Sequence, residues 1–246
     1  NVTFAFRRPD GELDPPALKN IDLTVEPGER IGILGATGAG KSALVNLVPR
    51  FYDTTDGRIT IDGHDVREIP QDQLREIVGI ALQEALLFQG DVRFNLKFGA
   101  EGVEDKQMFD AAKAADAHGF VTGLPETWGA PVARRGYNFS GGQRQRLSIA
   151  RTLTAAPKVL ILDDSTSALD VATESRVQAA IPELYEGITT IYIAQRISAV
   201  IDLDRIVLME NGEITAIGTH EELRATSPLY QEIYESQLGG IEEEKA

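Results

Sequence analysis

Apolar residues recur along this chain in two different periods, and the two periods alternate. Short apolar runs bounded by Gly, Pro or polar residues are typical of buried strands, whereas apolar positions three and four residues apart are typical of helices. The runs that predict strands cover 2–6, 17–25, 30–34, 57–63, 78–82, 159–162, 188–193, 205–210 and 213–217. The stretches that predict helices begin at residues 43 and 70 and cover 105–117, 140–156 and 173–184, with two short segments after 217.

The alternation of strands with helices predicts an α/β fold whose sheet is mostly parallel. Residues 91–155 depart from it, because they hold many alanines at helical spacing and no strong strand, so we expect a helical insertion there. Asn211-Gly212 separates the last two strands and predicts a hairpin turn of type I′. The predicted parts are a core of 1–90 and 156–240, a helical subdomain of 91–155 and a disordered acidic tail of 241–246.

Composition narrows the class of protein without indicating an activity. The chain has 246 residues, of which 42% are hydrophobic, and this is enough for a sizeable core. It has no cysteine, so disulfides and thiolate metal sites are excluded, and no apolar run approaches the ~20 residues of a membrane span. Its formal net charge of −14 argues against a nucleic-acid surface, which needs a basic face.

A glycine-rich stretch lies between the predicted strand of 30–34 and the helix that follows. It matches the phosphate-binding pattern G-x-x-x-x-G-K-[ST], and its residues are Gly35, Ala36, Thr37, Gly38, Ala39, Gly40, Lys41 and Ser42. Glycines allow turns that point successive N–H groups inward, and the helix adds the positive end of its dipole. We expect Lys41 to reach the β- and γ-phosphates of a nucleotide and the Ser42 hydroxyl to bind Mg²⁺. The alternative is a glycine-rich turn before an ordinary helix.

Two carboxylates, Asp163 and Asp164, follow the apolar run of 159–162. Ligands gather at the carboxyl ends of parallel strands, so Asp163 suits a Mg²⁺ ion held through water. Asp164 suits the positioning of an attacking water. The alternative, a strand that ends at a polar loop, is common, but a phosphate-binding loop in the same chain favours the functional role.

A second glycine-containing stretch lies at the start of one of the predicted helices. Ser140 is a good N-cap, and the two glycines after it let the backbone approach a ligand closely at a further free helix N-terminus. Ser140-Gly141-Gly142-Gln143 resembles the signature of ABC-type ATPases, whose common form is L-S-G-G-Q, with Phe139 here in place of the Leu. Almost the whole chain is similar to the nucleotide-binding domain of an ABC transporter of the exporter type. The further stretches that carry this resemblance are 48–53, 83–88 and 218–223.

The resemblance implies a P-loop NTPase core with a mostly parallel sheet, an antiparallel β subdomain on the N-terminal side and a helical insertion. It implies ATP and Mg²⁺ as cofactors, with Ser42, Gln83 and Asp163 around the metal and Gln83 also close to the attacking water. Phe6 lies where this family stacks an aromatic ring on adenine. The alternative for Phe6 is core packing on the same face as Phe4.

The resemblance also implies partners. In this family each ATP lies between the P-loop of one subunit and the signature of the other, in a head-to-tail dimer. The membrane domains of an exporter are the other implied partners, which places the chain at the cytoplasmic face of the cell membrane. The stretch that matches the D-loop, which touches the opposite monomer, is Ser167-Ala168-Leu169-Asp170.

Two departures from the family pattern bear on hydrolysis. Asp164 stands where the family has a catalytic Glu, and Gln195 stands where it has a switch His. Asp is shorter, so its carboxylate lies about 1 Å from the expected place, and such a misplacement can cost about a hundredfold in rate. Gln195 can donate a hydrogen bond but cannot become a cation. We therefore expect weak hydrolysis at a catalytic set of Asp164, Gln195 and Gln83, and an intact signature that serves a non-identical second ATP-binding domain.

Three alternatives stay open. The first is a self-paired and fully active ATPase of the same fold. The second is a DNA-repair or chromosome-structure ATPase, which the acidic charge and the lack of long coiled-coil inserts disfavour. The third is an ATP-dependent regulatory module without a membrane partner. The third alternative is disfavoured by three apolar residues, Leu86, Leu87 and Phe88, which suit contact with a docked helix of a membrane partner. Burial of these side chains in the core would also explain them.

Overall fold

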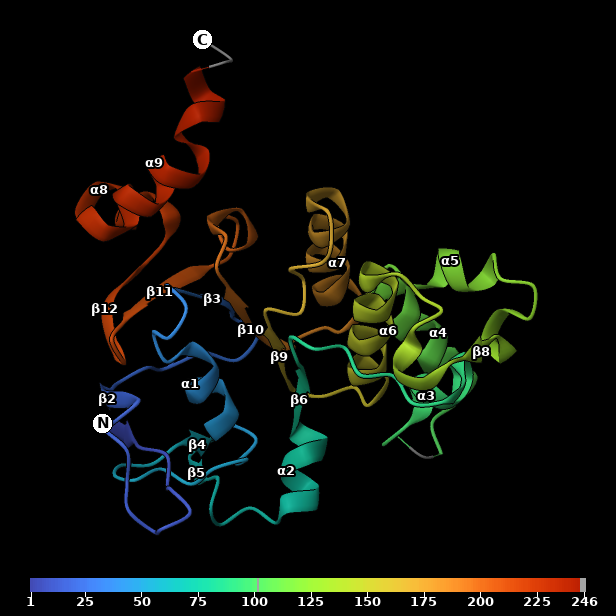
Figure 1. Cartoon of the computed structure of the whole chain (residues 1–246), viewed down its shortest axis with the longest axis horizontal. Helices are drawn as coiled ribbons and strands as arrows, with labels where there is room; N and C mark the ends of the chain where they lie inside the picture. Colours follow the sequence, from blue (N-terminus) through green and yellow to red (C-terminus); the bar gives the residue numbers. More distant parts are fainter. Residues whose placement is uncertain (101, 244–246) are drawn as a thin grey trace. The chain divides into compact units, whose positions relative to one another are not determined.

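Contacts within the computed structural model divide the chain into two compact units, Asn1–Leu74 with Ile191–Ala246, and Arg75–Thr190 (Figure 1). The structure describes residues 1–100 and 102–243, with side chains up to residue 238. None of the described helices combines the length and the apolar character that a bilayer crossing needs.

The first unit is built on a sheet that joins parallel and antiparallel pairs. Its strands are β3 (Arg30–Leu34), β10 (Thr189–Ala194, from Ile191 onward), β11 (Arg205–Glu210) and β12 (Glu213–Gly218). β3 lies between β10 and β11 and runs parallel to β11, with Ile31 opposite Arg205 and Leu34 opposite Leu208. β12 pairs antiparallel with β11. The inner positions of β3 and β11 are buried in continuous runs, which is typical of parallel strands covered on both faces.

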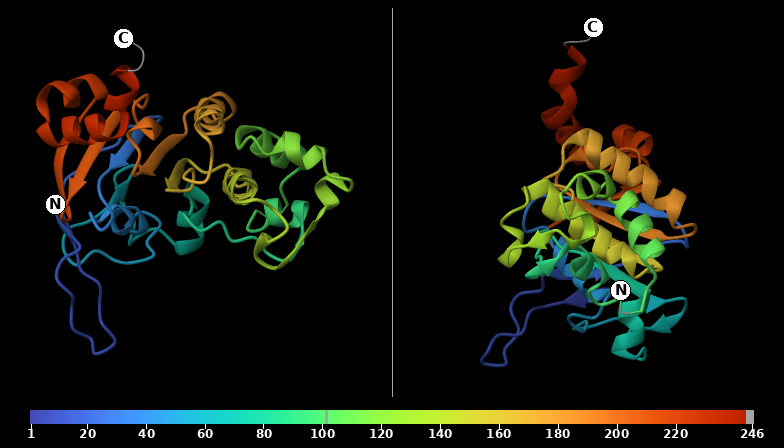
Figure 2. Two further views of the ribbon diagram at one scale, coloured as in Figure 1. Left: turned by 45° about the horizontal axis from the view of Figure 1, so that its top comes forward. Right: turned by 90° about the vertical axis from the view of Figure 1, so that its right-hand side faces the viewer.

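Two small antiparallel sheets complete the strands of this unit. β1 (Val2–Phe4) pairs with β2 (Leu18–Ile21), and β4 (Thr60–Ile61) pairs with β5 (His64–Asp65). The loop that joins β1 to β2 extends away from both strands (Figure 2). The antiparallel strands expected on the N-terminal side are confirmed. The predicted strand of 17–25 forms only over Leu18–Ile21, because its partner β1 has just three residues to pair with.

The hairpin between β11 and β12 is the one that the sequence predicts. Asn211 has a φ of 52° and Gly212 has a φ of 82°, and a type I′ turn requires positive values at both positions. The register places Glu210 opposite Glu213 with the two turn residues between them. The prediction of a hairpin at this dipeptide is therefore confirmed.

The helices of the first unit are α1 (Lys41–Leu47), α8 (His220–Thr226), α9 (Pro228–Glu243) and the 3₁₀ turn η3 (Ile197–Ala199), and α2 (Gln71–Ile77) leads out of it. α8 begins with a capping box, in which the Glu222 amide donates to Thr219 Oγ1 and the Thr219 amide donates to Glu222 Oε2 at 2.9 Å. α9 includes residues 241–243, and residues 244–246 lie outside those described, so the disorder of the acidic tail stays a prediction.

The second unit combines two parallel strands with a helical layer. β6 (Val78–Ala81) runs parallel to β9 (Val159–Asp163). The helices are α3 (Val92–Lys97), α4 (Asp105–Ala114), α5 (His118–Thr122), α6 (Gly141–Thr154) and α7 (Val171–Leu184), with 3₁₀ turns η1 (Thr127–Gly129) and η2 (Arg134–Gly136). α4 and α3 both pack against α6 (Figure 1). α4 can approach closely because its contact face is made of small, fully buried side chains such as Ala111 and Ala112.

Helices dominate the stretch of 91–155, as the spacing of its alanines predicts. The sequence did not predict the short antiparallel pair of β7 (Gly90–Asp91) and β8 (Pro131–Val132) at the edge of this stretch. The helix expected over 105–117 ends at Ala114, because Asp116 has a φ of 52° that a right-handed helix does not contain. The predicted fold class, an α/β fold with a mostly parallel central sheet, is confirmed.

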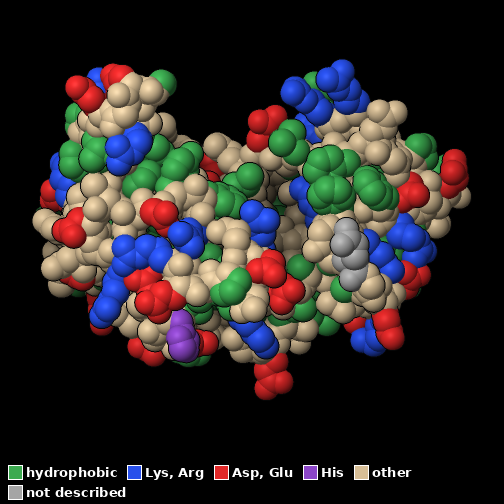
Figure 3. All heavy atoms as spheres, turned by 90° about the horizontal axis from the view of Figure 1, so that it is seen from below, with side chains coloured by type: hydrophobic (Ala, Val, Ile, Leu, Met, Phe, Trp, Pro, Cys, Tyr) green, Lys and Arg blue, Asp and Glu red, His purple; other side chains and the backbone are tan. Residues whose placement is uncertain are grey.

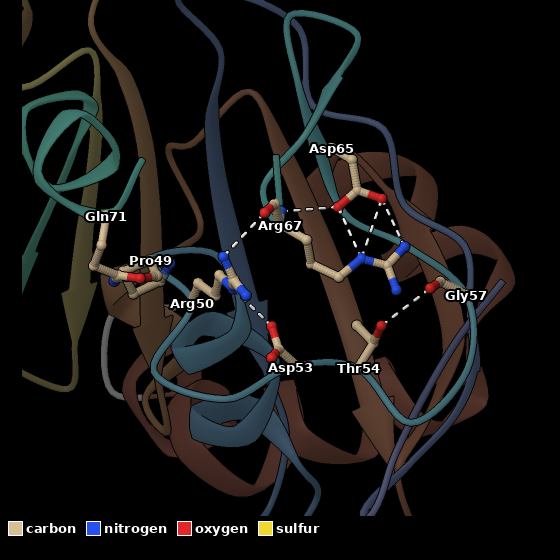
Figure 4. A network of polar contacts seen from close by, with 8 residues as sticks. All are labelled: Pro49, Arg50, Asp53, Thr54, Gly57, Asp65, Arg67 and Gln71. Carbon is tan, nitrogen blue, oxygen red and sulfur yellow. Dashed lines mark hydrogen bonds and ion pairs between the residues drawn. The ribbon is translucent and has the colours of Figure 1, made fainter. Parts of the chain in front are cut away.

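A network of charged side chains holds the loop that follows α1 (Figure 4). Arg50 donates to Asp53 at 2.7 Å and to the Arg67 carbonyl oxygen at 3.1 Å. Arg67 in turn forms a two-pronged ion pair with Asp65, whose shorter arm measures 2.6 Å. The hydrogen bonds from Arg67 lower the pKa of the Asp65 carboxyl to about 2. The same loop carries Tyr52, which lies between Arg50 and Asp53 in the sequence.

Candidate functional site

The phosphate-binding loop has a glycine at each end, Gly35 after β3 and Gly40 before α1, that nothing larger could replace. A Cβ on Gly35 would lie 2.3 Å from the Met209 carbonyl oxygen of β11, so only glycine permits this close approach. Gly40 has a φ of 100°, a left-handed value, and a Cβ there would lie 2.9 Å from the Ala17 carbonyl oxygen. The amide of Gly212 donates to the Ala39 carbonyl oxygen at 3.1 Å. The loop is therefore shaped by β2, β11 and the hairpin turn as well as by its own sequence.

The Lys41 side chain lies within this loop. It is buried, and its ammonium donates to the carbonyl oxygens of Gly35 at 2.7 Å and of Ala36 at 2.9 Å. A buried ammonium needs partners for its charge, and here the partners come from the turn that the motif itself forms. The ammonium is thereby held at the mouth of the loop, where the motif predicts contact with phosphate oxygens.

Phe6 belongs to a cluster of three aromatic rings in the first unit. Its ring lies 4.8 Å from that of Phe4 and 5.4 Å from that of Tyr52, with edge-to-face geometry in both pairs. Phe4 is 3% exposed and Phe6 is 39% exposed, so the two rings have different environments. Phe4 belongs to the core, whereas Phe6 is partly exposed to solvent, which supports adenine stacking over core packing. Stacking at Phe6 stays a prediction.

Gln195 follows the end of β10 in the first unit. Together with Gly35 and Ala36 it lines a cavity of about 270 Å³. The structure therefore brings the start of the phosphate-binding loop and the predicted switch residue to the same hollow. Gln237 of α9 also lines this cavity and was not singled out by sequence analysis.

Gln83 and Asp164 meet in the second unit. The Gln83 side-chain amide donates to Asp164 Oδ2 at 3.0 Å. Asp163, the last residue of β9, is buried, and Asp164 after it has a φ of 48°. A left-handed conformation is uncommon outside glycine, and it turns the chain sharply at the point where the two carboxylates follow each other. Two of the three residues predicted to be catalytic are thus in direct contact.

The signature stretch starts α6 with a capping box. The Gln143 amide donates to Ser140 Oγ at 3.2 Å, and the Ser140 amide donates to Gln143 Oε1 at 2.9 Å. A Cβ on Gly142 would lie 3.2 Å from the Ala168 carbonyl oxygen, so the D-loop passes close to the signature. Phe139 is buried and faces the ring of Phe120, which explains why a large apolar residue suits the position before Ser140.

Within the D-loop stretch, Asp170 has a clear local role. Its carboxylate caps α7 by accepting from the Thr173 amide at 2.9 Å and from the Thr173 hydroxyl at 2.8 Å. These hydrogen bonds lower the pKa of Asp170. The cap fixes the end of the D-loop, while the predicted contact of this stretch with an opposite subunit stays a prediction.

Gln145 ties together two stretches that sequence analysis treated separately. Its amide nitrogen donates to the Gln83 carbonyl oxygen at 3.0 Å, and its amide oxygen accepts from the Ala168 amide at 3.2 Å. The side chain is buried on α6. Sequence analysis missed Gln145 because α6 carries several polar side chains, and only the structure shows that this one is buried and hydrogen-bonded, as buried amides are.

Comparison with known proteins places these features in one family. The family model described as ABC transporter matches residues 18–167. The chain belongs to the ABC transporter family. It is 44% identical, over 97% of its length, to the ATP-dependent lipid A-core flippase of Syntrophus aciditrophicus. It is 46% identical, over 96% of its length, to the ABC transporter ATP-binding protein YfiB of Bacillus subtilis.

A solved ABC exporter has a similar structure. It is a bacterial exporter of the Atm1 family with ATP bound, and the similarity has a TM-score of 0.89 at 36% identity over 95% of this chain. The chain spans about two fifths of these relatives, namely 39% of the flippase, 40% of YfiB and 40% of the exporter chain. The resemblance to an ABC ATP-binding domain of the exporter type is therefore confirmed.

This ABC domain carries an exposed group of apolar side chains in its second unit, here called the aromatic surface, made of Leu86, Phe88, Phe94 and Phe98. Phe88 stacks on Phe98 with ring centroids 4.2 Å apart. The side chain of Asn95 holds the backbone of Phe88 by accepting from its amide at 2.7 Å and donating to its carbonyl oxygen at 2.8 Å. Leu86 and Phe88 are exposed, as a surface for a docked helix requires, whereas Leu87 is buried, so core burial explains that residue.

The first testable prediction concerns Gln145. Gln145→Met keeps the length of the side chain but leaves the Gln83 carbonyl and the Ala168 amide without this partner. We expect a loss of about 1–3 kcal/mol in the free energy of unfolding, because buried polar groups then stay unsatisfied. Urea denaturation measures it. The matched control is Gln107→Met, which removes one hydrogen bond to the Thr154 carbonyl oxygen. Equal losses in the two variants would contradict a special role for Gln145.

Proposed function

We propose that this chain binds Mg-ATP and supplies its energy to an ABC exporter at the cytoplasmic face of a membrane. The observation that carries the proposal is the phosphate-binding loop, in which the buried Lys41 ammonium is held by the loop's own carbonyl oxygens. Such a cationic group beside a nest of backbone N–H groups favours the phosphates of a nucleotide. The exposed ring of Phe6 supports an adenine as the base.

The donor set fits Mg²⁺. Ser42, Gln83 and Asp163 offer hydroxyl, amide and carboxylate oxygens, which are the ligands that this hard cation takes. Mg²⁺ keeps several waters and is commonly held through one or two protein groups together with substrate phosphates. When bound, Mg²⁺ would neutralise charge on the phosphates.

We propose further that the hydrolytic site of this chain is degenerate. Asp164 is short, and its Oδ2 accepts a hydrogen bond from Gln83 at 3.0 Å. A general base must lie within hydrogen-bond reach of the water it activates, and a carboxylate one methylene shorter than the family's Glu is withdrawn from it. Gln195 stays neutral at every pH, so it stabilises the transition-state charge less than an imidazolium does. Slow turnover with retained ATP binding follows from both substitutions.

An intact signature on a chain with a weak site favours a non-identical partner. The capping box and the close pass of the D-loop by Gly142 support a signature with its ordinary shape. In a head-to-tail dimer this signature would complete the partner's ATP site. The slow site of this chain would keep the dimer closed while the partner's site turns over.

The aromatic surface suits a helix of the exporter's membrane domain. Its members lie on two neighbouring stretches, Leu86 and Phe88 before β7 and Phe94 and Phe98 on or after α3, and they stay exposed in the second unit. The chain spans only about two fifths of its relatives, one of which is a flippase, so such a protein contains further chain for this surface to contact. Positive and negative side chains are mixed on the face shown in Figure 3, which gives no support to a nucleic-acid partner there.

ATP binding is tested by Lys41→Ala. We expect the affinity for Mg-ATP to fall at least about tenfold, because the loop loses its buried cation and the hydrogen bonds of a charged donor to phosphate. Titration with a fluorescent ATP analogue measures it. Lys106→Ala is the control, since Lys106 is an exposed lysine paired with Asp110 on α4. Unchanged affinity in both variants would overturn the proposed function.

The degenerate site is tested by the double variant Asp164→Glu with Gln195→His. We expect low ATP turnover in the unmodified chain and a gain of about tenfold or more in kcat, with a smaller change in KM, because both groups act on the transition state. Each single variant should gain less than the pair. Rapid turnover in the unmodified chain that the double substitution leaves unchanged would show that Asp164 is an adequate catalytic residue and that a self-paired, fully active ATPase is the better description.

Docking is tested with Phe98→Ser. With this chain and the membrane domain expressed as separate polypeptides, we expect the variant to lose most of its co-purification with the membrane domain in detergent. Burial of one large apolar side chain contributes about 1.5–3 kcal/mol, or roughly a tenfold to hundredfold change in affinity. Phe51→Ser is the matched control, because Phe51 lies in the first unit and is 47% exposed, as Phe98 is. Equal co-purification of both variants would count against this surface.

A further inference from the structure

The C-terminal helix of the first unit reaches the segment that carries the predicted switch residue. The side-chain amide of Gln237 on α9 accepts a hydrogen bond from the Ile197 amide at 2.8 Å. The same side chain donates to the carbonyl oxygen of Gln195 at 2.9 Å. One planar amide therefore fixes a backbone acceptor and a backbone donor two residues apart, on either side of Arg196.

The position of Gln237 is itself fixed by the start of α9. Tyr230 is fully buried, and its hydroxyl lies 2.7 Å from His220 Nδ1. Tyr234, one turn later, is also buried and packs against the ring of His220. These contacts with His220 anchor α9 over the turns that come before Gln237. On the other side of the contact, the side chain of Ile197 is fully buried in the core of the unit.

A shared cavity links this contact to the phosphate-binding loop. The hollow of about 270 Å³ is lined by Gly35 and Ala36 from the loop, by Gln195, and by Ile233 and Gln237 from α9. All of these residues belong to the first unit. The contact between Gln237 and the switch segment therefore borders the same hollow as the start of the phosphate-binding loop.

We propose that Gln237 is a positioning residue for the switch segment, and this role rests on the proposed ATP-binding function. By holding the carbonyl of Gln195 and the amide of Ile197 together, it restricts the backbone from which the Gln195 side chain projects. Among side chains of this length only an amide offers both a donor and an acceptor in one plane. Gln237 thus couples the C-terminal helix to the group that the bound γ-phosphate would meet.

The test compares Gln237→Met with Gln231→Met. Methionine has the same length and no strong hydrogen-bonding group, and Gln231 lies on the same helix but donates to the Arg224 carbonyl oxygen instead. In the 246-residue chain, we expect Gln237→Met to speed hydrogen exchange at the Ile197 amide about tenfold, because that amide loses its acceptor. Single-turnover hydrolysis of Mg-ATP should slow about threefold or more. Affinity for a fluorescent ATP analogue should change less than about twofold, because the phosphate-binding loop that holds the nucleotide is not altered by the substitution. Gln231→Met should move none of these.

A third variant separates the two hydrogen bonds. Gln237→Glu keeps an acceptor for the Ile197 amide but has no donor for the Gln195 carbonyl, so exchange at Ile197 should stay slow while hydrolysis falls as in Gln237→Met. Hydrolysis in Gln237→Met equal to that in Gln231→Met would overturn the role, even with faster exchange at Ile197, because the contact would then be structural only. Failure of the unmodified chain to bind Mg-ATP would instead overturn the proposed function itself, and the role with it.

Discussion

The contact on which the phosphate-binding loop depends is the close approach of Gly35 to the backbone of β11. The Met209 carbonyl oxygen occupies the space that a side chain on Gly35 would need. This packing is possible because β3 and β11 are parallel neighbours in the sheet. The chain therefore leaves β3 directly beside the last residues of β11. The hairpin that follows β11 then supplies the Gly212 amide to the Ala39 carbonyl. A loop shaped from outside in this way presents its ammonium and its N–H groups without first having to fold around a ligand.

In the second unit, side-chain amides hold stretches of chain in place. Gln145 on α6 bonds to backbone groups of Gln83 and Ala168, and Gln83 in turn bonds to the carboxylate of Asp164. Each of these contacts joins stretches that are far apart in the sequence. A buried amide such as that of Gln145 is rigid when both ends are hydrogen-bonded and costly when one end is left free. The arrangement therefore ties the stretches around Gln83, Ala168 and Asp164 to one another through side-chain hydrogen bonds.

Much of the fold follows from local patterns. The phosphate-binding loop, the hairpin at Asn211-Gly212 and the strand of 30–34 were placed within a residue or two, because glycine at positive φ and continuous apolar runs are local signals. The end of the helix at Ala114 was missed, since it is set by the left-handed turn at Asp116. The shortness of β2 was missed for a different reason, namely that strand length depends on the partner strand.

The candidate site likewise has features that the sequence predicts and features that only the tertiary structure reveals. The sequence by itself determined the phosphate-binding motif, the N-cap of the signature helix and the two departures at Asp164 and Gln195, because these are properties of single residues and their spacing. Only the tertiary structure decided that Phe6 is exposed while Phe4 is buried, that Leu87 points inward between exposed neighbours, and that Gln237 holds the backbone beside Gln195. Exposure and side-chain partners depend on which distant segments pack together, and a hydrogen bond between residues 42 positions apart leaves no periodic trace in the chain.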